Sequence, residues 1–309
     1  RKRRRPKGWK MPLSKKHLQL FEDYLRSEKN YSENTVKAYI KDIKLFQQFF
    51  RDSGVELKRL DSDFFDLFRR FLQYLRTRPM SNRSIARLQS SLKSYFRYLY
   101  IVKVTATDYS GRIRPVRFKK PLPEVATRNQ IESILNLAEG DSVWQKRDSA
   151  IMELFYSSGL RRAELASLSV EDIDYGAGVV RVLGKGGKER IVPVGDVALA
   201  RLQQYLHQRN RELKRFDLQA VFVNRRGGRL SQRSLGRIVR RYASDSGLMQ
   251  KFSPHSFRHS FATHILEGGA DLSAVGQLLG HSSLSSTQIY THVSLQQLRK
   301  VYKKTHPRA

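Results

Sequence analysis

Four stretches in the first third of the chain repeat apolar side chains every three or four residues, which is the period of an amphipathic helix. The stretch at 32–50 shows the pattern most fully, with Val36, Ile40, Ile43 and Phe46 on one stripe. Ser, Asp or Asn residues near the start of each stretch can cap its first turn. Helices of this length can bury their stripes only against one another, so residues 14–107 are predicted to form a helical bundle.

The rest of the chain combines helices with a small β-element. Residues 108–126 hold three prolines and several basic side chains without a regular apolar period, which is typical of a linker. Helical periods resume at 127–309. Within them, β-branched runs at Val179–Val182 and Ile191–Val194 flank the sequence GKGGK, which predicts a β-hairpin with a glycine-rich tip. The sequence LQAVFVN at 218–224 is a candidate third strand. The predicted fold class is therefore mainly α with a small antiparallel β-sheet.

The charge balance indicates a polyanionic partner. The 309 residues include 59 Lys and Arg against 28 Asp and Glu, a net charge of +31. Such a surface repels itself unless it meets a polyanion, and nucleic acid is the usual one; a Lys-rich or membrane-surface protein is the alternative. Residues 1–13 are a basic leader, expected to be disordered or artificial because Met11 could be the true start. Basic side chains of the bundle and linker are the candidate nucleic-acid contacts: Arg83, Arg87, Lys93, Arg97, Arg117, Lys119 and Lys120.

Two absences narrow the chemistry. The chain has no cysteine, which excludes disulfides, thiolate catalysis and Cys-based zinc sites. No apolar run approaches the ~18 residues of a transmembrane helix, and the N-terminus lacks the apolar core of a signal peptide. We therefore expect no membrane partner and a cytoplasmic location.

The stretch HSFRHSFATH places His255 and His259 four residues apart, as in the zinc motif H-E-x-x-H. No Glu follows His255, no third ligand is evident, and Arg258 would set a permanent cation beside the metal. We therefore expect neither a metal nor another cofactor. His255 and Arg258 lie three residues apart and can share a helical face that binds an anion.

Six side chains in the second half of the chain would together suit phosphodiester chemistry without a metal. Guanidinium groups match the paired non-bridging oxygens of a phosphate, and Lys or His can protonate a departing sugar oxygen. A tyrosine phenol can form a phosphoester that stores the bond energy for reversal. Taken singly, each residue also has an ordinary structural explanation, such as an arginine beside a helix cap. The candidates are Arg161, Lys185, His255, Arg258, His281 and Tyr290.

Four segments, in order and spacing, resemble the tyrosine recombinase (phage-integrase) family and, within it, the Xer recombinases that resolve chromosome dimers. They are SSGLRRAELASLSVEDID, VLGKGGKERIVPVG, SPHSFRHSFATHILEGGADLSAVGQLLGHSSLSSTQIYTHVS and the ending HPRA. The resemblance implies that Tyr290 attacks the scissile phosphate to give a 3′-phosphotyrosyl bond. It also implies that Arg161 and Arg258 grip the non-bridging oxygens.

The resemblance assigns the remaining candidates to proton transfer and phosphate binding. Lys185 would be the acid for the 5′ oxygen, His255 would assist the proton transfer, and His281 would orient the phosphate. Whether Lys185 or His255 carries most of the proton transfer stays open. His259 and His264 match no catalytic position of the family, so packing or backbone contact is expected for them.

The resemblance further implies a two-domain, C-shaped clamp around double-stranded DNA. Four protomers would assemble on two sites and exchange strands through a Holliday junction, with the C-terminal segment SLQQLRKVYKKTH docking on a neighbour. Whether the tetramer is homomeric or includes a paralogous recombinase, and whether a DNA translocase activates it, stays open. The alternatives are a phage- or transposon-type integrase, a type IB topoisomerase, and an architectural DNA-binding protein that has lost its activity.

Overall fold

The chain folds into two compact units, Arg1–Pro121 and Leu122–Ala309. The computed structural model describes residues 15–52, 60–114, 125–184, 189–248, 252–280 and 292–309, with the side chains of 60–63 and 292–296 left out. No helix within these ranges is both long and apolar enough to cross a bilayer.

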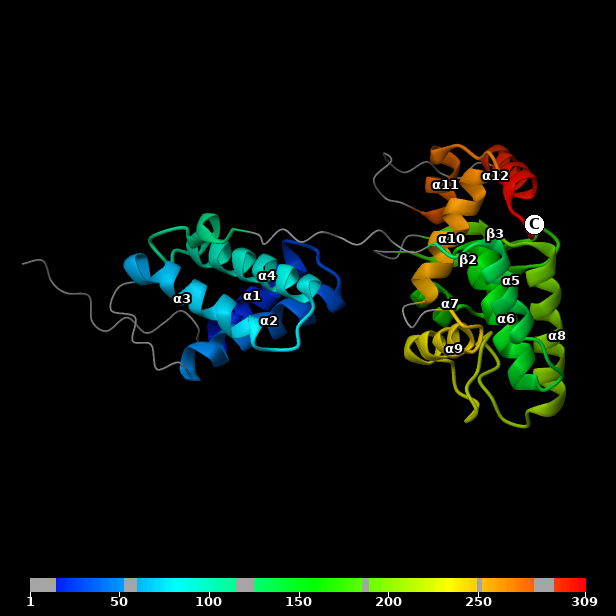
Figure 1. The fold of residues 1–309 in the computed structure, drawn as a ribbon, viewed down its shortest axis with the longest axis horizontal. Helices are drawn as coiled ribbons and strands as arrows, with labels where there is room; N and C mark the ends of the chain where they lie inside the picture. Colours follow the sequence, from blue (N-terminus) through cyan, green and yellow to red (C-terminus); the bar gives the residue numbers. More distant parts are fainter. Residues whose placement is uncertain (1–14, 53–59, 115–124, 185–188, 249–251, 281–291) are drawn as a thin grey trace, which may run out of the picture. The chain divides into compact units, whose positions relative to one another are not determined.

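The first unit is a bundle of α-helices, as the apolar periods predict (Figure 1). Three aromatic rings hold its centre: Phe46 lies 4.9 Å from Phe71 and 6.0 Å from Phe96 between ring centroids, both nearly edge to face. This arrangement places the positive edge of one ring against the negative face of the next. The elements are α1 (Lys15–Ser27), α2 (Glu33–Asp52), α3 (Leu60–Arg76), α4 (Asn82–Ile101) and the 3-10 turn η1 (Tyr109–Arg112).

Residues 108–113 pack with this first unit, although the sequence pattern predicts a linker from residue 108. Tyr109 and Ile113 are buried in the core of the bundle, and the ring of Tyr109 stacks on Phe64 at 4.8 Å. At the far end of the predicted linker, Ala126 is buried in the core of the second unit. The pattern missed these anchors because they are single apolar residues among prolines and basic side chains.

The second unit wraps its helices around one central helix, α6 (Figure 1). Every side chain of α6 from Arg147 to Ser158 is buried, and α8 and α10 pack against it. The unit consists of α5 (Arg128–Leu137), α6 (Val143–Ser158), α7 (Arg162–Ser167), η2 (Val170–Asp172), β1 (Ile173–Asp174), β2 (Val179–Leu183), β3 (Glu189–Pro193), α8 (Asp196–Glu212), α9 (Gln232–Asp245), α10 (Pro254–Glu267), α11 (Leu272–Leu279) and α12 (His292–Thr305).

The small sheet contains the predicted hairpin, but its third strand is not the predicted one. β2 pairs antiparallel with β3 in the register Val180 to Val192, and β1 joins the other edge of β2. The stretch 218–224 makes only isolated bridges, at Ala220 and at Val223. Its β-branched residues are buried in the core of the unit, so their apolar character reflects packing and not a strand ladder.

The C-terminal segment, which the resemblance implies docks on a neighbouring protomer, also packs on its own unit. Leu298 and Tyr302 of α12 are buried together with Phe261 and Ile265 of α10. The hydroxyl groups of Tyr302 and Ser157 are 2.9 Å apart. Within this chain, Leu298 and Tyr302 of α12 are therefore already covered.

The chain end beyond α12 adds a buried histidine, His306, whose surroundings select its neutral form. Nε2 donates to the carbonyl of Tyr156 at 3.2 Å, and Nδ1 accepts the backbone N–H of Arg308 at 3.0 Å. A second proton would sit on Nδ1, where it would point at the backbone N–H of Arg308, which is itself a donor. Burial lowers the pKa of His306 to about 4, against the hydrogen bond to the carbonyl of Tyr156, which raises it.

Candidate active site

The candidate site is built on two helix ends, each closed by a glycine in the left-handed conformation. α6 ends at Gly159 (φ +56°), as predicted, and α11 ends at Gly280 (φ +62°). A Cβ atom on Gly159 would lie 2.6 Å from Cδ1 of Phe261, so both the backbone and the packing require glycine. Helix C-termini leave carbonyl oxygens without intrahelical partners and carry partial negative charge. These two ends therefore attract cationic donors.

Arg258 of α10 joins the two helix ends. Its Nη1 donates to the carbonyl of Gly159 at 2.6 Å, and its Nη2 donates to the carbonyl of Leu279. The side chain is only 7% exposed. Burial, followed by repulsion from Arg161 and Arg190, lowers the pKa of Arg258 to about 10.

The start of α10 explains why Arg258 points inward. Ser253 is the N-cap and Pro254 the first helical residue, as predicted, and a proline at this position loses no helical hydrogen bond. Phe257, Phe261 and Ile265 form the expected apolar stripe and are fully buried. The stripe fixes the rotation of the helix about its axis, and Arg258 is carried into the interior beside it.

Arg161 reaches the same place from the turn between α6 and α7. It is the N-cap of α7, and its Nη2 donates to the carbonyl of Gly280 at 3.1 Å. Glu164 holds it twice, because Oε2 accepts the backbone N–H of Arg161 at 2.7 Å and Oε1 accepts from Nη1 at 2.8 Å. The side chain of Arg161 is 37% exposed, so one part of it remains open to a ligand.

Arg190 of β3 is a third guanidinium in the cluster, and sequence reasoning missed it. Its Nη1 and Nη2 donate to the two oxygens of Glu164 at 2.5 and 3.0 Å, and both side chains are buried. Burial by itself would raise the pKa of Glu164, but the hydrogen bonds from Arg190 and Arg161 outweigh it and hold the pKa below its usual value. Nε of Arg190 is buried without a partner in the described structure.

The cluster as a whole carries excess positive charge. Three guanidinium groups, from Arg161, Arg190 and Arg258, surround one carboxylate, Glu164. Guanidinium groups in a site of this kind bind oxyanions through directed, paired N–H groups. The arrangement can therefore hold a phosphate with donors that are already oriented by helix ends and by Glu164.

The structure brings together two of the six predicted catalytic residues and places a third of the six nearby. Arg161 and Arg258 share the cluster, and His255 lies on α10 one turn before Arg258 with an exposed side chain. Three predicted residues lie outside the described residues: Lys185, His281 and Tyr290. Their neighbours in the sequence are placed, since β2 and β3 lie on either side of Lys185 in the chain, and Gly280 directly precedes His281.

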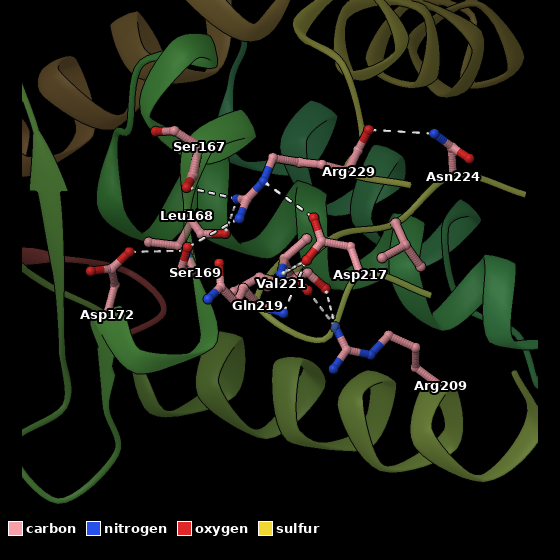
Figure 2. Close-up of polar contacts among 12 residues, drawn as sticks. Ser167, Leu168, Ser169, Asp172, Arg209, Asp217, Gln219, Val221, Asn224 and Arg229 are labelled. Atoms are coloured by element: carbon pink, nitrogen blue, oxygen red, sulfur yellow. Dashed lines mark hydrogen bonds and ion pairs between the residues drawn. The ribbon is translucent and has the colours of Figure 1, made fainter. Parts of the chain in front are cut away.

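A second arginine that sequence reasoning missed, Arg229, holds the far end of α7 (Figure 2). Its Nη1 donates to the carbonyls of Ser167 at 2.7 Å and Leu168 at 2.8 Å, and its Nη2 to Oγ of Ser169 at 3.1 Å. The two carbonyls are acceptors that a helix leaves without intrahelical partners at its C-terminus. Because Arg161 caps the other end, Arg229 helps to fix the short helix on which Arg161 sits.

The four predicted nucleic-acid contacts on α4 differ in whether their side chains form an ion pair with a carboxylate. Arg83 and Lys93 are exposed. Arg87 instead makes a bidentate pair with the buried Asp42, at 2.8 and 2.9 Å. Arg97 pairs with Asp108. The predicted contacts Arg117, Lys119 and Lys120 lie outside the described residues.

The three histidines of the stretch HSFRHSFATH differ in their burial. His255 is exposed and His259 is half-buried. His264 is buried, and its Nδ1 lies 2.9 Å from the hydroxyl of Tyr156, which agrees with the packing role expected for it. Within the described ranges, no three His, Cys, Asp or Glu side chains gather as a metal site needs.

Comparison with known proteins identifies the family. Residues 124–297 match the model of the phage integrase family, and residues 18–102 match the phage integrase N-terminal SAM-like domain. The chain is 40% identical over 296 residues to tyrosine recombinase XerC of Natranaerobius thermophilus, covering 94% of this chain and 98% of the relative. It is 37% identical over 290 residues to tyrosine recombinase XerD of Staphylococcus epidermidis, covering 93% and 97%.

Solved structures share the fold. The XerH site-specific recombinase bound to its difH substrate in a pre-cleavage complex aligns with a TM-score of 0.64 at 21% identity, covering 93% of this chain and 81% of that one. The Tn1549 transposon integrase in complex with circular intermediate DNA aligns with a TM-score of 0.64 at 22% identity, covering 91% and 98%.

The two matched family models and the relatives at 37–40% identity define the class, that of the tyrosine recombinases. The chain belongs to the phage integrase family. It is an enzyme of site-specific tyrosine recombination, which cuts and rejoins DNA, and its relatives favour the Xer type over the integrase alternative.

Proposed function

We propose that this chain resolves chromosome or plasmid dimers at cell division, with Tyr290 as the nucleophile. The phenolic oxygen of Tyr290 bonds to the scissile phosphorus as the bond to the 5′ oxygen breaks, which leaves a 3′-phosphotyrosyl link and a 5′-hydroxyl. Attack by the 5′-hydroxyl of a partner strand reverses this step, and two such exchanges pass through a Holliday junction. Because the phosphoester conserves the bond energy, neither ATP nor a metal is required. Similarity to XerC and XerD supports this role.

The observation that carries the proposal is the convergence of Arg161 and Arg258 on adjacent carbonyl groups, those of Gly280 and Leu279. The two guanidinium groups come from α7 and α10, which are far apart in the sequence. Their excess charge suits the non-bridging oxygens of a phosphoryl transition state. Because the helix ends hold both groups in place before a ligand arrives, little reorganisation is needed during the reaction.

The other three residues are proposed to move protons and to orient the phosphate. Lys185 protonates the departing 5′ oxygen, and His255 assists in this transfer or accepts the proton of the tyrosine. His281 donates to the phosphate. Two placements support this assignment: His255 is exposed one turn from Arg258, and Gly280, the neighbour of His281, lies in the cluster.

The proposed partner is double-stranded DNA held by both units. Arg83 and Lys93 are available for phosphate contacts, whereas Arg87 and Arg97 are shared with carboxylates, so their contribution should be weaker. Four protomers, identical or with a paralogous recombinase, are proposed to assemble on two sites in the cytoplasm. A DNA translocase is a further proposed partner.

The proposal is tested by trapping the covalent intermediate. Binding sites are first selected from randomised duplexes with the inactive Tyr290→Phe protein. A selected site is then nicked beside the scissile position, so that cleavage releases a short fragment and cannot reverse. We expect a covalent protein–DNA band in EDTA without ATP, and no band with Tyr290→Phe.

Three results would contradict parts of the proposal. A band that persists in Tyr290→Phe would show that another side chain is the nucleophile. No band on any selected site, despite tight binding, would favour the architectural DNA-binding alternative. Relaxation of a supercoiled plasmid that lacks the site would favour the topoisomerase alternative, and we expect none.

A further inference from the structure

A second concave site lies on the other face of α9 from the catalytic helices. Gly236 of α9 faces Arg162 of α7, where a Cβ atom would lie 3.4 Å from the Nη1 atom of Arg162. Ser234, Ile238 and Arg241 are separated from Gly236 by about half a helical turn, and they line a cavity of ≈ 680 Å³. This volume is in the range of small-ligand sites, about 300–1,000 Å³.

The walls of the cavity are strongly basic. Five arginines line it, with one carboxylate, Asp148. Asp148 is buried and holds two of the five, since it accepts from Arg147 at 2.7 and 2.9 Å and from Arg241 at 2.9 Å. The other three are exposed and have no ion pair with a carboxylate in the described part of the chain: Arg225, Arg226 and Arg237.

Two helix N-termini and an aromatic ring complete the cavity. Ser142, Trp144 and Gln145 at the start of α6 and Ser234 at the start of α9 line it, and neither helix has an acidic residue in its first turn. The caps Ser142 and Ser231 each accept one first-turn N–H group, but no carboxylate neutralises either helix dipole, so its positive end still favours an anion. The guanidinium carbon of Arg147 lies 4.9 Å, and that of Arg225 5.8 Å, from the ring centroid of Trp144.

We propose that this cavity, the Trp144 pocket, binds a phosphate ester that is separate from the scissile phosphate. Unpaired guanidinium groups and two helix N-termini converge on it, and both recognise phosphate oxygens. None of its lining residues belongs to the arginine cluster of the candidate active site. The phosphate ester comes either from a free phosphorylated small molecule or from the backbone of DNA that flanks the recombination site. The DNA-backbone source rests on the proposed function.

Trp144 gives a direct readout, because the chain has only two tryptophans and the other, Trp9, can be replaced. The full-length protein with Trp9→Phe and Tyr290→Phe is titrated with inorganic phosphate, with adenosine monophosphate, and with duplexes that carry the selected site with or without 10 flanking base pairs (an added length of about one helical turn). Sodium chloride at matched ionic strength is the salt control. The test variant is Arg225→Gln with Arg237→Gln. The matched control is Arg211→Gln with Arg215→Gln, which removes two exposed arginines outside the pocket.

We expect a saturable change in Trp144 emission that needs about tenfold more ligand in the test variant and is unchanged in the control variant. Saturation by phosphate or adenosine monophosphate alone supports the free ligand. A change produced only by the flanked duplex supports the DNA backbone. No saturable change with any probe, or equal loss in both variants, would overturn the proposal. Covalent trapping on the unflanked duplex with Tyr290 intact reports separately on the proposed function.

Discussion

Replacing Glu164 by Gln should expose how the arginine cluster is balanced. Glu164 is 2% exposed and is the shared acceptor for Arg161 and Arg190. Gln keeps the shape of the side chain, but it removes the negative charge and turns one oxygen acceptor into an NH₂ donor. That donor then faces guanidinium N–H groups. Arg190, which is 7% exposed, is left as a buried charge without a counter-ion.

The size of the effect follows from the burial of the pair. Removing one partner of a buried ion pair costs about 3–5 kcal/mol, mainly because the other charge stays buried and unpaired. We therefore expect Glu164→Gln to lower the free energy of unfolding of the second unit by about 3–5 kcal/mol. Adding Arg190→Met removes the stranded charge, so the double variant should lose less than the sum of the two single variants by about 1–3 kcal/mol.

The assay is urea unfolding followed by the fluorescence of Trp144 in a Trp9→Phe background, which reports on the second unit. Sodium sulfate should raise the urea midpoint of Glu164→Gln more than that of the parent, because a divalent anion can replace the missing carboxylate among three guanidinium groups. Sodium chloride at equal ionic strength is the control. Strict additivity of the two single variants, together with equal sulfate effects, would refute the view that Glu164 and Arg190 form one charge-balanced unit with Arg161.

Three further predictions concern stability. The pKa of His306 is lowered to about 4 from 6.5, so the unfolded chain takes up the proton first: stability is complete above pH 6.5 and falls by up to about 3 kcal/mol as the pH drops to about 4. His306→Gln should flatten this part of the pH profile, and an unchanged slope in urea unfolding would be the contrary result. Gly159→Ala should cost at least about 1–2 kcal/mol for its left-handed backbone, and Phe261→Leu in the same chain should recover part of the clash in thermal unfolding, whereas full additivity would argue against that contact. Arg87→Met should destabilise the first unit by about 1–3 kcal/mol because it strands the buried carboxylate of Asp42, and circular dichroism should show recovery when Asp42→Asn is added; no recovery would argue against the pairing.

The local elements could be predicted from the sequence because their signals are local. The apolar period of three to four residues predicted the bundle, and the β-branched runs around GKGGK predicted the paired strands β2 and β3. Ser253, Pro254 and Gly159 predicted helix ends that the structure confirms. The stretch 218–224 shows the limit of this reasoning. Its short run of apolar residues is equally compatible with a strand and with a loop that is buried in the core, and only its tertiary neighbours decide between them.

The arginine cluster could be predicted only in part, because its contacts join distant segments. Arg190 pairs with Glu164 across 26 positions and Arg161 with the carbonyl of Gly280 across 119. The sequence did contain one signal for Arg190, a charged residue at an inward position of a strand that alternates with the buried Val192. The docking of α12 on its own unit had no such signal, since an apolar stripe is the same whichever surface covers it.

The central claim is that the cluster neutralises the charge of the scissile phosphate during attack by Tyr290. It is tested most directly by replacing that phosphate with a methylphosphonate, which lacks one negative charge, in the nicked duplex. On the ordinary phosphate, Arg161→Met should form the covalent complex about 10²–10³-fold more slowly than the parent. On the methylphosphonate, we predict that Arg161→Met regains most of this loss relative to the parent, while Tyr290→Phe forms no complex on either duplex. An Arg161→Met protein that is equally impaired on both duplexes would contradict the account.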